Sequence, residues 1–339
     1  MALIVSVRVR LACLLLCQLV LASVPAGAQV AVGPQIMATA KALVSFLKEK
    51  CPVAPPGDAE AFKSCQSALF ASEDFGHLFA PSITWGGAKE GVPVWQSPNT
   101  RFDSTLFRSL YLPLFMFDGK FNIAHEEPTS WTLVKLHVAF RNGLGAGEFP
   151  YPFWHDGKKW DAYQAANELI FRIDPVTAQI WNLQRNTNPE IATIFVPPVP
   201  SPAFDGKWTW SDGDKKFQPA VTLYDGIFDG GNPYKSAMSE AYKDFALSLR
   251  DKSCVACHNP SNPRHMRPLV LLQTPAHAAG EIKALIAAVS DNRMPLTEWG
   301  LADPMNEADK LSFLRKARAF DEAAARAFAW EKANHAKAP

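Results

Sequence analysis

The residues most able to do chemistry stand together at 254–258, in the order Cys-Val-Ala-Cys-His. Two thiols lie three residues apart, and an imidazole follows the second thiol directly. This pattern is compatible with a thioredoxin-like redox dithiol, with half of a zinc site, with covalent attachment of a haem, or with chance. The segments on either side of the motif favour one of these four interpretations.

The context of the motif favours haem attachment. A thioredoxin-like dithiol follows a strand in a βαβ unit, whereas residues 236–253 have a helical pattern. A zinc site needs a second ligand pair, and His265 and His277 are a poor substitute for one. Thiols three residues apart on a helical turn face the same way, so Cys254 and Cys257 can add to the two vinyl groups of one porphyrin.

The imidazole of His258 completes this prediction. Because His258 follows Cys257 directly, it is placed beneath the iron as the proximal ligand. Asn259-Pro260 then ends the turn. The sequence therefore predicts a single haem c that is attached through Cys254 and Cys257.

The C-terminal third of the chain resembles a class I c-type cytochrome domain. The resemblance covers residues 235–325 and rests on "KSCVACHN", on Met294-Pro295 within "NRMPLTEWG", and on a helical segment that starts at Asn306. It implies that Met294 is the distal ligand of the iron. It also implies that the carbonyl of Pro268 accepts a hydrogen bond from the proximal histidine and fixes its orientation.

Other ligands for the distal position stay open at this point. Met266 and His265 lie close to the motif, Met305 lies farther along the chain, and the iron could also lack a sixth ligand. The choice matters for function because His/Met ligation raises the potential and saturates the iron, which favours electron transfer. An open position would favour binding or activation of a small molecule.

The first 28 residues have the pattern of a secretory signal peptide. Two arginines precede the apolar run 11–22, and Ala-Gly-Ala at 26–28 is a cleavage site before Gln29. The apolar run is too short to be preferred as a membrane anchor, and no later stretch is long and apolar enough to span a bilayer. We therefore expect a protein exported to the bacterial periplasm, without a transmembrane segment after removal of the signal.

In an exported protein, the cysteines outside the haem motif are expected to be paired. Cys51 and Cys65 remain once the signal and the haem motif are set aside. In an oxidising compartment a disulfide between them is the simple hypothesis. It would join the end of a helix predicted at 35–49 to the body of a helix predicted at 58–70.

The rest of the pattern predicts a mixed fold, in which an N-terminal α+β domain of unknown role (29–230) precedes an all-α cytochrome c-like domain (231–339). Glycine, proline and acidic residues cluster at 224–235 and mark the boundary. The N-terminal region resembles no known family. The elements expected are helices at 35–49, 58–70, 236–253, 280–290 and 306–332, a strand at 131–145, and a hairpin around Asp174-Pro175.

Composition excludes some functions and leaves others open. The 339 residues carry a formal net charge of +1, which gives no reason to expect nucleic-acid binding. Four histidines (77, 125, 137 and 155) are too scattered to predict a metal site, and no catalytic residue is assigned.

We expect a single-haem electron carrier that serves redox partner proteins of the periplasm. The alternatives are a two-domain oxidoreductase with a haem relay and a haem-based sensor of small molecules.

Overall fold

The computed structural model describes residues 33–86, 100–127, 129–145, 148–149, 157–202, 210–211, 217–218, 228–252, 254, 275–297 and 299–335. In chain order its elements are α2 (Pro34–Lys50), α3 (Ala59–Ala71), α4 (Glu73–His77), β1 (Phe79–Trp85), β2 (Thr100–Asp103), α5 (Ser104–Leu110), the 3-10 helix η2 (Leu112–Leu114), β3 (Phe115–Glu126), β4 (Trp131–Phe140), α6 (Gly157–Gln164), β5 (Glu168–Ile173), β6 (Ile180–Asn186), β7 (Trp210–Ser211), β8 (Phe217–Gln218), α7 (Lys235–Asp251), α8 (Pro275–Ser290) and α9 (Glu307–His335).

Six strands form one mixed sheet in the order β2-β1-β6-β5-β4-β3. Strand β1 pairs parallel with β6, and the other neighbouring strands pair antiparallel. The turn between β5 and β6 starts at Asp174, whose side chain accepts hydrogen bonds from the next backbone amides, and this confirms the predicted hairpin. Strands β7 and β8 form a separate two-stranded sheet.

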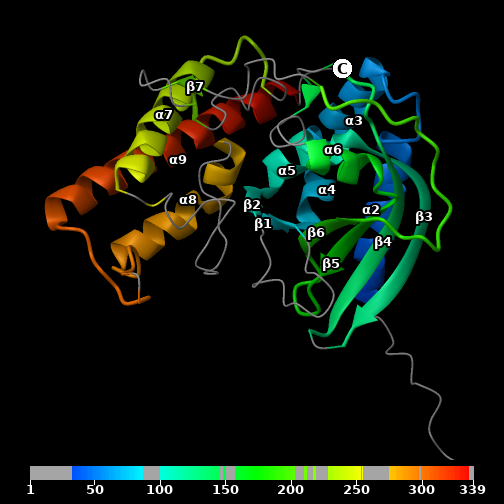
Figure 1. Cartoon of the computed structure of the whole chain (residues 1–339), viewed down its shortest axis with the longest axis horizontal. Helices are drawn as coiled ribbons and strands as arrows, with labels where there is room; N and C mark the ends of the chain where they lie inside the picture. The colour runs from blue at the N-terminus through cyan, green and yellow to red at the C-terminus, as the bar shows by residue number, and fades with distance from the viewer. Residues whose placement is uncertain are drawn as a thin grey trace, which may run out of the picture. The chain divides into compact units, whose positions relative to one another are not determined.

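Helix α2 covers one face of the large sheet (Figure 1). Its residues Ala40, Leu43 and Leu47 recur every three or four positions and are fully buried, as the predicted amphipathic helix requires. They belong to the same apolar core as alternate residues of β4, such as Val134 and Leu136, which are also fully buried or nearly so. The intervening residues of β4 therefore point to the opposite face of the sheet.

A disulfide joins α2 to α3. Cys51 follows α2 directly and Cys65 lies within α3, and their Cα atoms are 4.8 Å apart. Both residues are fully buried in the apolar core. The side chain of Asp58 caps α3 by accepting a hydrogen bond from the Ala61 amide at 2.9 Å, so the start of this helix is fixed beside the disulfide.

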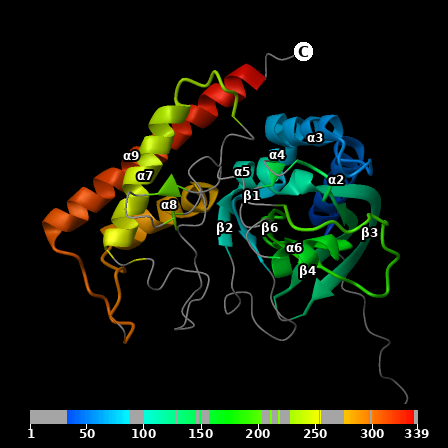
Figure 2. The same cartoon turned by 45° about the horizontal axis from the view of Figure 1, so that its top comes forward.

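The last three helices pack on one another. Helices α7 and α9 lie against each other in both ribbon views, and α8 also contacts α9 (Figure 1, Figure 2). Before α7, the side chain of Asn232 donates hydrogen bonds to the Ala327 carbonyl at 3.1 Å and to the Glu331 carboxylate at 2.9 Å. The turn that leads into α7 is thereby tied to the last turns of α9.

The expected arrangement of an α+β domain followed by a separate all-α cytochrome c-like domain is wrong. Pro34–Pro339 form one compact unit, in which α8 packs against β2 and also contacts β1 and α5. The ring of Phe328 on α9 stacks on Phe70 of α3, with the ring centroids 6.5 Å apart. Helices α8 and α9 therefore bury part of their apolar surface against the N-terminal elements, and not only against each other and α7. The predicted domain limits, 29–230 and 231–339, stay a prediction.

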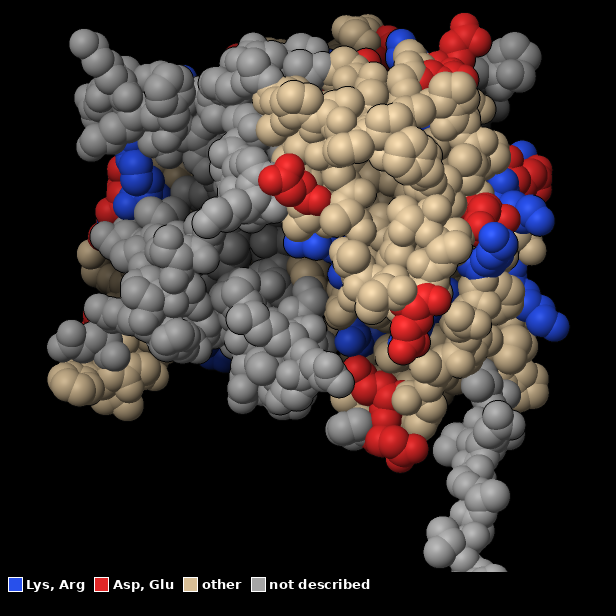
Figure 3. Space-filling model, turned by 45° about the vertical axis from the view of Figure 1, so that its right-hand side comes forward, with Lys and Arg blue, Asp and Glu red and all other residues tan. Residues whose placement is uncertain are grey.

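No helix in the described part of the chain is long and apolar enough to cross a membrane. The predicted signal peptide, residues 1–28, lies outside the described residues. On the face of the molecule drawn in Figure 3, acidic and basic side chains are interspersed over the described surface, in line with the formal net charge of +1.

Candidate functional site

Helix α7 leads to the first residue of the Cys-x-x-Cys-His motif. One face of α7 is buried against α9, and its apolar residues are Met238, Tyr242, Phe245 and Leu249. The ring of Phe245 stacks on Phe320 of α9 with centroids 5.8 Å apart. Cys254 follows the end of the helix by three residues and is half-buried against the apolar core. The helical approach that the sequence predicts is therefore present.

Met294 lies in the loop that follows α8. Its backbone amide donates a hydrogen bond to the Ala288 carbonyl at 3.2 Å, and its half-buried side chain packs against the apolar core. The loop then turns back on itself, and the Thr297 amide donates to the Leu301 carbonyl at 2.7 Å. Met305 is also half-buried against the core and stays an alternative source of a thioether ligand.

The first turn of α9 holds the segments that carry Cys254 and Met294. The ammonium of Lys252 lies 2.7 Å from the carboxylate of Asp309, two residues before the first cysteine of the motif. The next residue of α9, Lys310, donates a hydrogen bond to the side-chain oxygen of Asn292 at 2.8 Å, two residues before Met294. The hydrogen bond from Lys252 lowers the pKa of Asp309, so this carboxyl is charged at neutral pH. Two consecutive residues of one helix thus anchor both segments.

Part of the predicted ligand set lies outside the described residues, namely Cys257, His258, Pro268, and the alternatives His265 and Met266. The described members are Cys254 and Met294. Their chemistry fits a covalently bound haem, because one supplies a thiol for a thioether bond and the other a thioether sulfur that is a known ligand of haem iron. Both are half-buried next to apolar side chains, which is the environment that a porphyrin needs.

The histidines do not gather into a metal site in the described part of the chain. Among those residues, no group of three or more His, Cys, Asp or Glu side chains could hold a metal ion. His77 ends α4, and His125 and His137 lie on neighbouring strands of the sheet. His155 lies outside the described residues.

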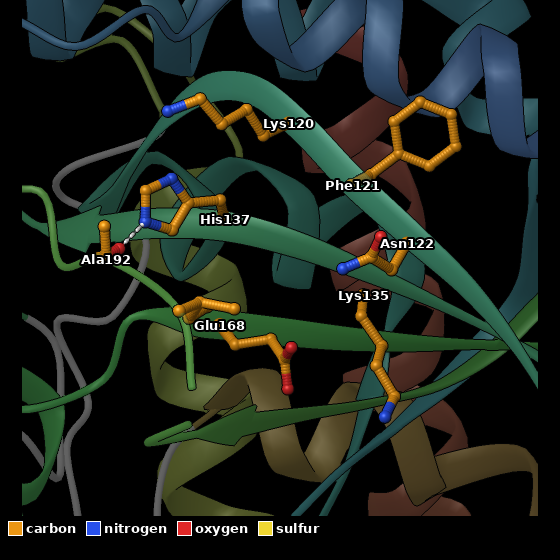
Figure 4. Close-up of a pocket in the computed structure, with 8 residues that line it drawn as sticks. Lys120, Phe121, Asn122, Lys135, His137, Glu168 and Ala192 are labelled. Carbon is orange, nitrogen blue, oxygen red and sulfur yellow. Dashed lines mark hydrogen bonds between the residues drawn. The ribbon is translucent and has the colours of Figure 1, made fainter. Parts of the chain in front are cut away.

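A second candidate site is an open pocket of about 300 Å³ on the large sheet. It lies on the face of β4 that carries Lys135 and His137, which alternate with residues buried under α2. Figure 4 shows that its walls come from β3, β4 and β5 and from the segment that follows β6. The lining residues are Lys120, Phe121, Asn122, Lys135, His137, Glu168, Ile191 and Ala192.

His137 fixes one end of this pocket. Its Nδ1 lies 2.7 Å from the Asp118 carboxylate, and its Nε2 is hydrogen-bonded to the carbonyl of Ala192 (Figure 4). The ammonium of Lys120 is 3.2 Å from the same carboxylate. Burial alone would raise the pKa of Asp118, but hydrogen bonds from the Lys120 amide and from the side chains of His137 and Lys120 outweigh burial and lower it. His137 therefore ties β4 to β3 and to the segment after β6.

Glu168 lies opposite His137 on β5 and is only 2% exposed. Its carboxylate accepts hydrogen bonds from the side-chain amides of Asn186 at 2.8 Å and Asn188 at 3.3 Å. Both donors are neutral. Among the described residues no ion pair joins Glu168 to a cation, and none joins Lys135 to a carboxylate. The pocket thus holds an acid and a base that are not paired with each other.

Comparison of the chain with protein-family models, with curated proteins and with solved structures finds no match. No relative therefore assigns a role to either candidate site. The residues of the motif and the geometry of the described side chains carry the functional interpretation.

The pocket was not predicted from the sequence. Its signal was present in "WTLVKLHVAF", where Lys135 and His137 occupy alternate positions of a strand that is otherwise apolar or uncharged. Alternating polar residues usually mark a face in contact with water, so the pattern alone did not indicate a site. The partner Glu168 lies about thirty residues farther along and meets His137 only through strand pairing.

Proposed function

We propose that this protein is an exported, single-haem c-type electron-transfer protein. In this proposal Cys254 and Cys257 attach the haem, His258 is the proximal ligand, and Met294 is the distal ligand. The observation that carries the proposal is the anchoring of the Cys254 and Met294 segments by consecutive residues of α9, added to the specificity of the Cys-x-x-Cys-His motif.

In this proposal the two cysteine thiols hold the haem through covalent bonds. Each thiol adds across one vinyl group, with its sulfur bonding to one carbon and its hydrogen going to the other, so no oxidant is consumed. Such a bond keeps the cofactor in place even where contacts are few. When bound, the haem supplies a one-electron couple whose potential is raised by a methionine ligand.

Packing of the described helices supports the same function. Apolar side chains of α7 and α9 close the space between the two helices, with Phe245 within 6 Å of both Phe313 and Phe320. A dry, rigid surround limits the rearrangement that follows a change of charge at the iron, which favours rapid electron transfer.

Export to the periplasm belongs to the same proposal. The signal pattern of residues 1–28 supports it, and the disulfide between Cys51 and Cys65 suits an oxidising compartment. Mass spectrometry of the protein purified from a periplasmic extract should find a mature chain that starts at Gln29.

Methionine substitutions test the ligand assignment. The protein is produced with export, and covalent attachment is checked by whether the haem resists extraction by acidified acetone. Met294→Ala should lower the reduction potential, abolish the far-red absorption typical of ferric haem with a sulfur ligand, and open the ferrous iron to carbon monoxide. Met305→Ala is the matched control, because Met305 is also half-buried against the core, and it should leave all three properties unchanged.

Three outcomes would overturn the proposal in different ways. Haem that is extracted by acidified acetone would exclude covalent attachment. A response to Met305→Ala instead of Met294→Ala would reassign the distal ligand. Ready binding of carbon monoxide by the unmodified ferrous protein would favour an open iron and hence a sensor.

A further inference from the structure

The pocket on the large sheet plays no part in the proposed electron transfer, and its side chains have features that indicate a ligand. Figure 4 shows Lys120 of β3, Lys135 and His137 of β4 and Glu168 of β5 around the pocket. The pocket belongs to described residues of β3, β4, β5 and the segment after β6. The inference from it does not depend on the haem.

We propose that this pocket binds a small amino acid in its zwitterionic form. The ligand's ammonium would face Glu168, and its carboxylate would face Lys135. Both residues line the same pocket.

The acid side of the argument rests on Glu168. Its side chain is almost fully buried, yet its hydrogen-bond donors are the neutral amides of Asn186 and Asn188. A buried carboxylate with no cation beside it is costly, because neutral dipoles replace only part of its hydration. A ligand ammonium at this position would supply the missing positive charge and two or three further hydrogen-bond donors.

The base side rests on Lys135. It is partly buried on β4, and among the described residues it has no carboxylate partner. Lys120, the other lysine of the pocket, already lies 3.2 Å from Asp118 and is largely exposed. A ligand carboxylate therefore has one ammonium available that is not paired with a carboxylate of the described residues. Charge-assisted hydrogen bonds of this kind are about twice as strong as neutral ones.

Size and shape limit the ligand. A volume of about 300 Å³ is at the small end of ligand pockets, so it suits a compound with few heavy atoms. Ile191 offers apolar surface for a short aliphatic side chain. A divalent anion fits less well, because Glu168 would repel its second charge.

The experiment compares L-alanine with two analogues that each lack one charge, propionate and ethylamine. Binding to the full mature protein is measured by calorimetry and by the rise in unfolding temperature, first with a panel of the common L-amino acids and then with the analogues of alanine. We expect one or more small apolar amino acids to bind at millimolar concentration. Alanine should bind roughly tenfold more tightly than either analogue, which is the effect of one lost charge-assisted contact.

Two variants assign the charges. Lys135→Gln should weaken alanine and propionate by about tenfold and leave ethylamine unchanged, and Glu168→Gln should weaken alanine and ethylamine but not propionate. Lys63→Gln, at an exposed lysine of α3, is the control for a lost surface charge and should change nothing. If Glu168→Gln does not fold, the contrast between propionate and ethylamine in Lys135→Gln still decides the orientation of the ligand.

No binding by any amino acid of the panel would overturn the proposal. So would equal binding of propionate by Lys135→Gln and by the wild-type protein, since Lys135 would then not contact the ligand carboxylate. Tighter binding of propionate than of alanine would show that the pocket takes a simple anion and that Glu168 does not contact the ligand.

Discussion

Removal of the disulfide should cost the fold about 3 kcal/mol. Cys51 and Cys65 are separated by 14 positions, and a closed loop of about 15 residues restricts the unfolded chain by roughly this free energy. Both cysteines are fully buried, so the smaller side chains of the double variant Cys51→Ala/Cys65→Ala would add a cavity cost of the same sign. The free energy of unfolding should therefore fall by about 3–4 kcal/mol.

The assay is equilibrium unfolding in urea, followed by tryptophan fluorescence and circular dichroism. The wild-type protein is measured with and without a reductant, and the double variant is measured in parallel. Reduction tests the crosslink alone, since it breaks the disulfide but keeps both sulfur atoms in the core. The slope of the free energy with urea should also rise slightly after removal, because the unfolded chain becomes less compact.

A loss smaller than about 1 kcal/mol in both experiments would refute the loop-entropy argument. A large loss in the alanine variant with almost none on reduction would show that packing at this position, and not the crosslink, stabilises the junction of α2 and α3.

Two further predictions concern single side chains. Because the folded-state pKa of Asp118 is lowered, its stabilising contribution is present above the ordinary value of 3.8 and is lost as the pH falls below it. Asp118→Asn should therefore lose more stability relative to wild type at pH 6 than at pH 3, and an equal loss at both would contradict the assignment. Trp160→Phe removes the hydrogen bond from the fully buried indole to the Val199 carbonyl, at 2.8 Å, and should cost about 1–3 kcal/mol in urea unfolding. A cost near zero would mean that water replaces the indole.

The helices were the most predictable part of the fold. The period of apolar residues at 35–49, 58–70 and 236–253 indicates α2, α3 and α7 to within one or two residues, because each buries a single continuous stripe. Helix α8 begins at Pro275, well before the predicted start at 280. Proline is tolerated in the first turn of a helix, but in a sequence it usually marks an interruption.

The sheet was much less predictable than the helices. Strand β3 contains Asp118-Gly119 in its interior, and Gly119 has a positive φ of 85°, so the segment resembles a turn more than a strand. Strands β1 and β6 pair across about a hundred residues, and no local pattern indicates such a partner. A still longer separation in sequence concealed the contact of α8 with β2, which is why the separate helical domain was expected.

The two candidate sites also differ in how much of them the sequence predicts. The Cys-x-x-Cys-His motif is contiguous, so the prediction of haem attachment needs only five neighbouring residues. The anchoring of its flank by Asp309, and of the Met294 loop by Lys310, depends on where the first turn of α9 lies in space. The pocket depends on register alone, since Glu168 and His137 become neighbours only when β5 pairs with β4.

Two other buried charges of this fold, Arg172 and Arg108, contrast with Glu168. Arg172 is 4% exposed, lies 3.3 Å from the Glu126 carboxylate, and donates hydrogen bonds at 2.8 Å to the side-chain oxygens of Asn182 and Gln184 on β6. Arg108 donates to the Leu69 carbonyl at 2.7 Å and lies over two phenylalanine rings, although burial still lowers its pKa to about 10. Each of these cations has negative charge or an electron-rich ring beside it. Among the described residues, Glu168 has only neutral amides as hydrogen-bond donors to its side chain. A cation that enters the pocket from solution would compensate its buried negative charge.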